Sequence, residues 1–276
     1  MSLTPAPRSH LVVAADTHPG ETGKNNEDHY AVRTFTAPDA QPVTLAIVCD
    51  GVGGNRAGEV ASALAVDVIG ARVAESDGDD YRAIFTEAVA QASREIASLA
   101  DTNLEYKGMA TTCAIAVVHG RQLFTAYVGD SRLYLYRHGP DRIRQISVDH
   151  TWLQAAVEHG LIKPEDAPAH PNQHVLLRHL GSKSDAKPDF RLKLADYESP
   201  EDAETNQGMA IDPGDTVLVC SDGLSDLVKI DEIGVALRVY APAKAVDELI
   251  TLARQRGGHD NITVVVLRLP DGTSRM

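Results

Sequence analysis

Three apolar segments follow one another so closely in the sequence that their connections leave no room for a helix. Residues 111–118, 122–128 and 133–137 are rich in Val, Ala, Leu and Tyr, and only a few residues separate each from the next. Parallel neighbouring strands need a crossover of about a dozen residues or more, whereas antiparallel neighbours need only a short turn. The segments therefore predict antiparallel strands, and they exclude a sheet built from repeated strand–helix–strand units.

Other parts of the chain add strands and helices to this antiparallel core. Alternating or continuous apolar runs predict strands at residues 11–15, 29–35, 43–49, 190–194, 216–220 and 262–269. Apolar residues spaced three and four apart predict helices at 57–69, at 84–96 and from about 242 to Gly257, with a shorter helix at 152–159. So many strands are unusual for one twisted sheet, and we predict an α+β fold of two packed antiparallel sheets with helices outside.

The composition is that of a soluble globular protein. The chain has 276 residues, of which 43% are hydrophobic and 24% are charged. It contains no apolar run near the roughly 18 residues that cross a bilayer, and its first residues lack the apolar core of a signal peptide. We therefore expect a cytoplasmic protein with a short disordered lead-in at 1–10 and a C-terminal tail at 270–276.

The formal net charge of −13 restricts the kinds of partner that the protein can bind. Nucleic acid and anionic membrane surfaces would be repelled, so we expect neither as a partner. An enzyme that acts on phosphate groups would face the same repulsion. It would need strong local positive charge, which a bound metal ion could supply.

The cysteines argue against a thiol-based reaction. Cys49, Cys113 and Cys220 lie in apolar, strand-like runs without metal-ligand spacing, which favours buried thiols in a reducing compartment. A cysteine-dependent phosphatase needs an Arg after five intervening residues. Asp226 occupies that position after Cys220, and Asn55 occupies it after Cys49. This class of enzyme is therefore excluded.

Two segments lack a regular apolar pattern. Residues 150–180 contain the short predicted helix and then a stretch with Pro and His, and residues 196–209 are acidic and nearly without aliphatic side chains. We expect the acidic segment to be a mobile surface loop.

Acidic residues stand where predicted strands begin or end. Five such edges carry them, at Glu27 with Asp28, Asp50, Asp130, Asp222 and Asp260. Each alone is ordinary turn chemistry. In a two-sheet core several of these edges could converge, and carboxylates that close would repel one another unless a cation neutralised them. Oxygen ligands of this kind suit Mg²⁺ or Mn²⁺, but the residues alone leave both interpretations open.

The glycines after Asp50 raise the alternative of a dinucleotide-binding loop. Gly51 and Gly53 would require a third glycine at position 56, where the chain has Arg56. The Asp50 carboxylate would also face a pyrophosphate of like charge, and the parallel strand context is missing. A dinucleotide-binding oxidoreductase is therefore excluded.

Eight stretches match, in order, the motifs of one known family. They are NNEDHYAV (25–32), VCDGVGGNRAGEVAS (48–62), GMATTCAIAV (108–117), AYVGDSRLYLYR (126–137), VDHT (148–151), LLRHLG (176–181), GDTVLVCSDGLSDLV (214–228) and GGHDNITVVV (257–266). The chain resembles the metal-dependent serine/threonine protein phosphatases of the PPM type, or protein phosphatase type 2C, in their bacterial form. The resemblance implies one phosphatase domain at 11–269, an α-β-β-α sandwich, and a flap at about 150–180 beside the catalytic cleft.

The resemblance also implies a centre of two Mn²⁺ or Mg²⁺ ions. Asp50 would bridge the two ions, the Gly51 carbonyl would bind beside it, and Asp222 and Asp260 would complete the shell of the first ion. These three aspartates are the implied catalytic residues. A hydroxide that bridges the ions would attack the phosphorus of phosphoserine or phosphothreonine in proteins, without a phosphoenzyme.

Further residues receive supporting roles from the resemblance. Glu27 would act on a metal through water, Asp28 would orient waters around the ions, and Asp130 would help to hold a third, weaker ion. Asn261 would lie with Asp28 just outside the metal ligands. The implied partner is a phosphoprotein, with a serine/threonine kinase or its targets as candidates, and we expect a monomer that acts in signalling.

The chain departs from the family pattern at two positions. Gly23 stands where members usually carry an Arg that binds the substrate phosphate, and Lys24 beside it is the candidate replacement. Val52 stands where some members have a His that could act as the general acid.

Two questions follow from these departures. The histidines of the flap region, His150, His170 and His179, are candidate acids only by their place in the sequence. The missing Arg keeps open the alternative of a regulatory or pseudo-phosphatase module with weak turnover.

Overall fold

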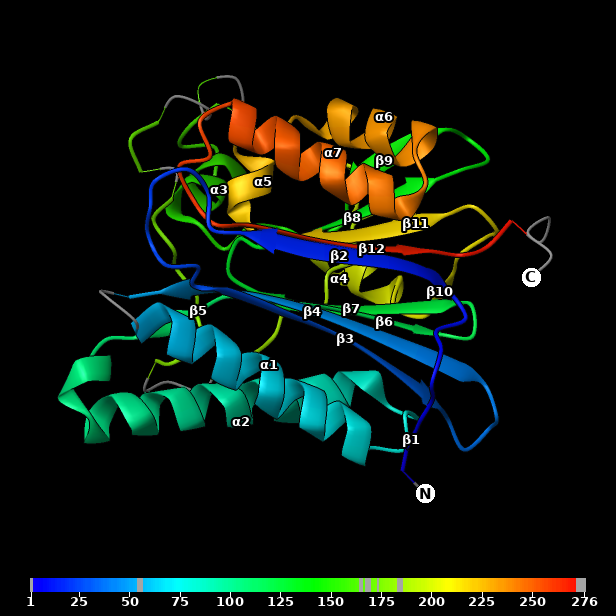
Figure 1. The fold of residues 1–276 in the computed structure, drawn as a ribbon, viewed down its shortest axis with the longest axis horizontal. Coiled ribbons are helices and arrows are strands. Elements are labelled where there is room, and N and C mark those ends of the chain that lie inside the picture. Colours follow the sequence, from blue (N-terminus) through cyan, green and yellow to red (C-terminus); the bar gives the residue numbers. More distant parts are fainter. Residues whose placement is uncertain are drawn as a thin grey trace.

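The computed structural model describes residues 2–53, 57–163, 166, 170–172, 174–182 and 186–271. Two sheets pack face to face, and helices cover the outer face of each sheet (Figure 1). Every strand pairing in these residues is antiparallel. The predicted α+β fold, an α-β-β-α sandwich of two antiparallel sheets, is confirmed.

The first sheet takes its strands from the first half of the chain and closes with a short strand from the second half. In spatial order its strands are β1 (Thr4–Pro5), β3 (Asp28–Thr36), β4 (Pro42–Val52), β6 (Cys113–His119), β7 (Gln122–Val128) and β10 (Met209–Ala210), and β5 (Ala110–Thr111) pairs with β4.

The second sheet joins the two ends of the domain. Its strands, in spatial order, are β2 (Val12–His18), β12 (Ile262–Arg268), β11 (Thr216–Cys220), β8 (Arg132–Arg137) and β9 (Arg142–Gln145).

Helices lie on both outer faces of the sandwich, and shorter helices occupy the connections. The long helices α1 (Ala57–Glu75) and α2 (Tyr81–Thr102) cover the first sheet, and α6 (Ile230–Val239) and α7 (Pro242–Gln255) cover the second (Figure 1). The shorter ones are η1 (Leu104–Tyr106), α3 (Trp152–Glu158), α4 (Pro200–Thr205) and α5 (Asp222–Ser225). No helix among the described residues has both the length and the apolar character to cross a membrane.

The strand β4 shows how the sequence builds two adjoining layers of core. Leu45, Ile47 and Cys49 pack in one cluster with residues of α1 and α2, whereas Ala46 and Val48 pack with the second sheet. All five side chains are fully buried. A strand that is buried on both faces is a continuous apolar run in the sequence, and that is the pattern of residues 43–49.

The prediction of a disordered lead-in at 1–10 is wrong for the described residues. Thr4 and Pro5 pair with the end of β3 as strand β1. Leu3 is buried, and its N–H donates to the carbonyl of Ser76 at 2.7 Å. Because this segment fills an apolar site and extends the sheet edge, it is held in place. The expected tail at 270–276 lies outside the described residues from 272 onwards.

The predicted strand at 190–194 is also wrong. Only the preceding Asp189 makes an isolated bridge, to Tyr127. The backbone groups that follow bond elsewhere, since the N–H of Leu192 donates to Ala203 at 2.9 Å and the N–H of Lys193 donates to Ile146 at 2.9 Å. Phe190 and Leu192 are buried, although the segment is not part of a sheet.

The acidic segment 196–209 is not an irregular loop. It contains helix α4, which begins with a capping box between Ser199 and Asp202 and has Pro200 in its first turn. Ala203 is buried, and Met209 starts strand β10. Local capping and one buried contact are therefore sufficient to order a segment that lacks aliphatic periodicity.

Helix α6 and strand β9 were not predicted, and the predicted strand at 111–118 is divided into β5 and β6.

Candidate metal centre

Both sheets contribute acids to the same end of the sandwich. In the antiparallel pair β3–β4, the first residue of β3, Asp28, lies opposite Asp50 near the end of β4. In the second sheet, β11 ends just before Asp222 and β12 begins just after Asp260 and Asn261. This placement brings together residues that are far apart in the chain.

Asp28 connects the two sheets. One of its carboxylate oxygens, Oδ2, accepts hydrogen bonds from Ser221 Oγ at 2.6 Å and Thr263 Oγ1 at 2.7 Å. The other oxygen, Oδ1, is buried without a partner among the described residues. Burial raises the pKa of Asp28 to about 6, although the two hydrogen bonds oppose this rise.

Asp50 is held through its backbone. Its N–H donates to Thr112 Oγ1 at 3.0 Å, and its carbonyl accepts from Thr112 N–H at 2.9 Å and from Thr111 Oγ1 at 2.8 Å. Burial raises the pKa of the Asp50 carboxyl well above its usual range, and the charges of Asp28 and Asp222 add to that rise. Its charged form therefore needs a cation nearby.

Gly51 lies where the chain passes between two other backbone segments. A Cβ at this position would lie 2.2 Å from the carbonyl oxygen of Gly58 and 2.6 Å from that of Glu27. The N–H of Gly51 donates to the same Glu27 carbonyl at 3.1 Å. Only glycine fits such a close approach, so the strand end, Glu27 and helix α1 are packed together.

The carboxylate of Glu27 adds another buried acid to this group. Its Oε1 atom is buried and has no hydrogen-bond partner in the described part of the chain. Burial raises the pKa of Glu27, and the charges of Asp260 and Glu59 contribute to the rise. The charge of Lys24 opposes it, so this lysine lies near enough to Glu27 to interact with it.

Asn261 fixes the loops around the acids. Its Oδ1 accepts from the N–H of Glu27 at 2.8 Å, and its Nδ2 donates to the carbonyls of Pro19 and Asn25 at 3.1 Å each. Its own N–H donates to Asp260 Oδ1 at 2.8 Å. Asn261, predicted to lie just outside the metal ligands, thus orients the segments that carry Glu27 and Asp260.

Asp222 begins helix α5 and has several other acids around it. Its Oδ1 atom is buried and makes no hydrogen bond with the described residues. Burial raises the pKa of Asp222 well above its usual range, and the charges of Asp130, Asp226 and Asp260 raise it further. Gly223 follows it because a Cβ there would lie 2.0 Å from the carbonyl oxygen of Asn261.

The group as a whole fits a divalent cation. Buried carboxylate oxygens without partners carry a large free-energy penalty, and Glu27, Asp28 and Asp222 each have one such oxygen. A divalent ion would satisfy these oxygens and neutralise the mutual repulsion, and an all-oxygen set suits Mg²⁺ or Mn²⁺.

Asp130 lies beside this group, in a cavity of about 410 Å³. Burial raises the pKa of Asp130 to about 7, with a further contribution from the charge of Asp149. Arg132 lines the same cavity, but its guanidinium is engaged with the Asp149 carboxylate through contacts of 2.6 to 3.1 Å. Asp222, Asp226 and His174 are also part of the lining.

The three candidate histidines have other contacts. His150 is buried, its Nδ1 accepts from the N–H of Gly129 at 3.1 Å, and its Nε2 lies 3.0 Å from Asp189 Oδ2. His170 stacks on Trp152 with ring centroids 5.1 Å apart. His179 Nδ1 contacts the carbonyl of Leu180, and none of the three histidines lines the Asp130 cavity.

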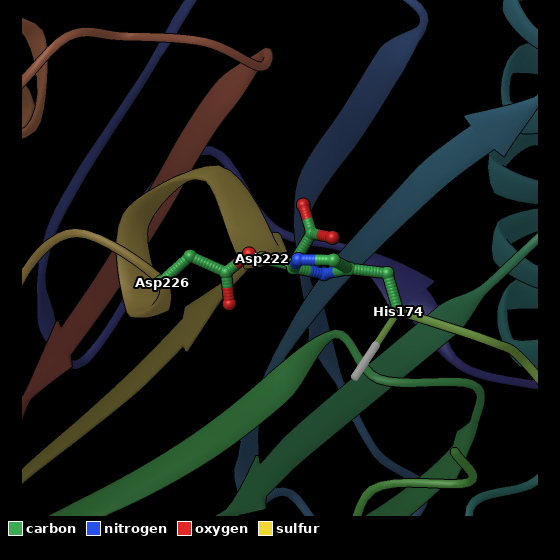
Figure 2. Close-up of side chains that lie close together, drawn as sticks. All are labelled: His174, Asp222 and Asp226. Carbon is green, nitrogen blue, oxygen red and sulfur yellow. Dashed lines mark ion pairs between the residues drawn. The ribbon is translucent and has the colours of Figure 1, made fainter. Parts of the chain in front are cut away.

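Two residues of the cavity were missed by the sequence reasoning. Asp226 comes four residues after Asp222, and that helical spacing could have revealed it. His174 belongs to the segment expected to form the flap, and no spacing relates it to the acids. Figure 2 shows His174, Asp222 and Asp226 facing one another.

The structure also describes the positions at which the chain departs from the family pattern. Gly23 has a φ of +73°, and no atom lies within 4 Å of where its Cβ would be. Lys24 is exposed, and Val52 is 45% exposed at the end of β4. Arg56, on which the exclusion of a dinucleotide loop rests, lies outside the described residues.

Comparison with known proteins places the chain in a family. The sequence model of the protein phosphatase 2C family matches residues 17–261. The chain belongs to this family. Its membership confirms the assignment to a family of serine/threonine phosphatase enzymes, the PPM type that the motifs indicated.

Among curated relatives of this phosphatase 2C chain are two named serine/threonine phosphatases. The protein stp of Listeria innocua is 32% identical over 258 residues, which cover 91% of this chain and 93% of the relative. PstP of Mycobacterium tuberculosis is 34% identical over 262 residues, which cover 95% of this chain but only 45% of the relative. The chain thus spans about half the length of the mycobacterial protein.

Solved structures agree with the fold. The serine/threonine phosphatase of S. agalactiae superposes with a TM-score of 0.80 at 28% identity, covering 94% of this chain and 99% of the other. The catalytic domain of PstP in complex with two manganese ions has a TM-score of 0.76 at 32% identity, covering 94% and 97%.

Proposed function

We propose that this protein hydrolyses phosphoserine and phosphothreonine in proteins, with Mn²⁺ or Mg²⁺ as the cofactor. The observation that carries the proposal is the convergence of Glu27, Asp28 and Asp222, each with a buried oxygen that has no partner in the described residues. Membership of the phosphatase 2C family supports the reaction class, and the manganese complex of PstP supports the metal.

The ions would supply the positive charge that the polypeptide lacks. When bound, they provide positive charge for the phosphoryl oxygens and lower the pKa of a water that serves as the nucleophile. The chain itself has a net charge of −13, so the attraction of a phosphate group depends on this local reversal of sign. Because water attacks directly, no side chain becomes phosphorylated.

Residues from both sheets would hold the ions. Asp50 and the carbonyl of Gly51 would bind from the first sheet, and Asp222 and Asp260 would bind from the edge of the second. This assignment agrees with the electrostatic interaction among the three aspartates, because the charges of Asp222 and Asp260 both raise the pKa of Asp50.

The neighbouring polar residues would keep the centre in order. Asp28 is fixed by Ser221 and Thr263, and its second oxygen is available to accept from an ordered water. The Glu27 carboxylate would act in the same way, since Asn261 holds its backbone. Asp130 would contribute to a third, weaker ion from the adjoining cavity.

Lys24 is the proposed contact for the substrate phosphate. It is exposed, and its charge acts on Glu27 at the edge of the centre. Val52 cannot donate a proton, so solvent water would protonate the leaving group. We also propose that the protein acts as a monomer in bacterial cytoplasmic signalling, on a serine/threonine kinase or its targets.

The test is a comparison of the wild type with Asp50→Asn. Hydrolysis of p-nitrophenyl phosphate and of a phosphothreonine peptide is measured with and without Mn²⁺. We expect turnover only with the metal. For Asp50→Asn we expect a loss greater than the roughly 10–100-fold that removal of an outer-shell partner costs. Asp67→Asn, which removes an acid whose side chain is 80% exposed, is the matched control and should leave turnover unchanged.

Two outcomes would contradict the mechanism, namely turnover without metal and full activity of Asp50→Asn. The absence of turnover on both substrates with Mn²⁺ bound would instead favour the alternative of a regulatory or pseudo-phosphatase module. The absence of the phosphate-binding Arg at Gly23 is the observation behind that alternative, and the complete set of acids opposes it.

A further inference from the structure

We propose that Thr112 is a positioning residue that holds the backbone of Asp50 against the turn of residues 129–131, which carries Asp130. Thr112 lies between β5 and β6, and the turn lies between β7 and β8. These contacts are a property of the fold. Their consequence for metal binding rests on the proposed function.

Asp50 pairs with Thr112 in an irregular way. The register of β4 with β5 places Gly51 opposite Thr111, so Asp50 lies opposite Thr112. In a regular antiparallel pair of this kind, each N–H donates to the carbonyl of the opposite residue. Here the N–H of Thr112 donates to the Asp50 carbonyl at 2.9 Å, but the N–H of Asp50 donates to Thr112 Oγ1 at 3.0 Å. A side-chain hydroxyl thus replaces one backbone acceptor of the sheet.

The same hydroxyl contacts the turn of residues 129–131. Thr112 Oγ1 lies 2.7 Å from Ser131 Oγ, and both side chains are buried. A hydroxyl oxygen has lone pairs for accepting as well as a proton for donating, so Thr112 can bond to Asp50 and to Ser131 at once. Ser131 directly follows Asp130. Two hydroxyl groups therefore connect the backbone of Asp50 to the residue next to Asp130.

The methyl group of Thr112 contacts the other end of this turn. Gly129 has a φ of +106°, and a Cβ at this position would lie 2.5 Å from Thr112 Cγ2. Glycine therefore allows the turn to pack directly against the threonine. Both branches of the Thr112 side chain contact the turn, one on each side of Asp130, and this fixes the turn relative to the end of β4.

These contacts oppose a repulsion between the two acids. The charge of Asp130 contributes to the raised pKa of Asp50, so the two carboxyl groups interact. Like charges favour separation when no cation lies between them. Because Thr112 holds the two backbones together, the acids do not have to be brought back into place when an ion binds. Such preorganisation increases affinity.

The test is the affinity of the full chain for Mn²⁺, measured by calorimetry, in two variants of Thr112. Thr112→Val keeps the shape of the side chain and removes its hydroxyl. The affinity should fall at least about tenfold, because groups that orient metal ligands are worth about 10–100-fold. Thr112→Ser keeps the hydroxyl and removes the methyl group, and it should bind Mn²⁺ more tightly than Thr112→Val.

Strand β4 provides a matched control at its other end. Thr44 is buried, and its Oγ1 atom lies 2.7 Å from Ser9 Oγ, the same distance as in the pair of Thr112 with Ser131. Thr44→Val therefore removes an equivalent hydroxyl contact away from the acids. It should lower the melting temperature and leave the affinity for Mn²⁺ unchanged.

A double-mutant cycle tests the contact itself. Ser131→Ala should also weaken Mn²⁺ binding. The loss in the double variant with Thr112→Val should be smaller than the product of the two separate losses, because both changes remove one shared contact. If Thr112→Val does not fold, Ser131→Ala decides the question, since it removes the same hydroxyl pair from the other side.

Three results would overturn the proposal. They are wild-type Mn²⁺ affinity in Thr112→Val or in Ser131→Ala, an equal loss in Thr44→Val, and separate losses that simply multiply in the double variant. Because the readout is metal binding, a wild type that binds Mn²⁺ without turnover would contradict the proposed phosphatase function and leave this result unaffected.

Discussion

Lys24 is the proposed contact for the substrate phosphate, because Gly23 stands where members of the family usually carry an Arg. The adjacent Gly23 has a φ of +73°, a conformation that carries about 1–2 kcal/mol of strain for a residue with a side chain. An Arg in that position would therefore meet an unfavourable backbone, although the surrounding space is open. The cation that this loop offers beside Glu27 is Lys24.

We predict that Lys24→Ala raises the KM for a phosphothreonine peptide several-fold, with little change in kcat. An exposed charge contact of this kind is worth up to about 1 kcal/mol, and it would act on binding rather than on the attacking water. Steady-state kinetics of the Mn²⁺ enzyme provides the measurement. Lys244→Ala on helix α7 removes the same charge far from the centre and should leave KM unchanged. An unaltered KM in Lys24→Ala would show that the lysine does not contact the substrate.

At the scale of elements, the centre depends on how closely the end of β4 approaches the start of α1. Gly51 on β4 has room for no side chain, because the backbones of Gly58 and Glu27 both lie where its Cβ would be. This contact sets the position of the Asp50 carboxylate relative to Glu27. The helix and the strand thus form the first-sheet side of the proposed metal centre together.

Gly51→Ala should lower the free energy of unfolding by about 1–3 kcal/mol or more, as overpacking does, and should weaken Mn²⁺ binding at the same time. Gly139→Ala is a suitable control, because no atom lies within 4 Å of a Cβ built there. Chemical denaturation and Mn²⁺ titration measure the two effects. If both alanine variants behaved alike, the close packing at Gly51 would not be important for the centre.

At the scale of the whole molecule, the sandwich gathers acidic side chains from both sheets at one of its ends. Burial raises the pKa of Asp28 to about 6 and that of Asp130 to about 7, from a usual value of 3.8. A raised pKa means that the folded protein binds more protons than the unfolded chain. The stability that these groups contribute is therefore present at low pH and is lost as the pH rises through 6 to 7.

We predict that Asp130→Asn stabilises the metal-free protein more at pH 8 than at pH 5. The difference in melting temperature between variant and wild type should grow by roughly 5 °C over this range, from the size of the pKa shift. Melting curves in EDTA provide the measurement. His150, whose pKa is lowered by burial, has the opposite pH dependence, but it is common to both proteins and cancels in the difference. A difference that does not change with pH would contradict the role of Asp130.

The spacing of apolar residues in the sequence predicted much of the fold. It failed for segments whose structure depends on contacts with distant parts of the chain. Period-two and continuous apolar runs identified most strands, because burial on one or both faces produces these patterns directly. The segment at 190–194 has the same period-two alternation, yet its backbone bonds to Ala203 and Ile146 instead of a strand. Helix α4 was missed because a capping box and the buried Ala203, rather than a stripe of aliphatic residues, stabilise it.

The sequence by itself determined the antiparallel connectivity, the family, and the acids at the strand ends, since short connections and motif order are properties of the linear chain. Only the tertiary structure decided which of these acids meet. Asp28 reaches Ser221 across 193 positions of sequence, and His174 faces Asp226 from a flap that no spacing relates to α5. The physical reason is that such contacts depend on how the two sheets and the flap pack, and side-chain packing between distant segments leaves no periodic trace in the sequence.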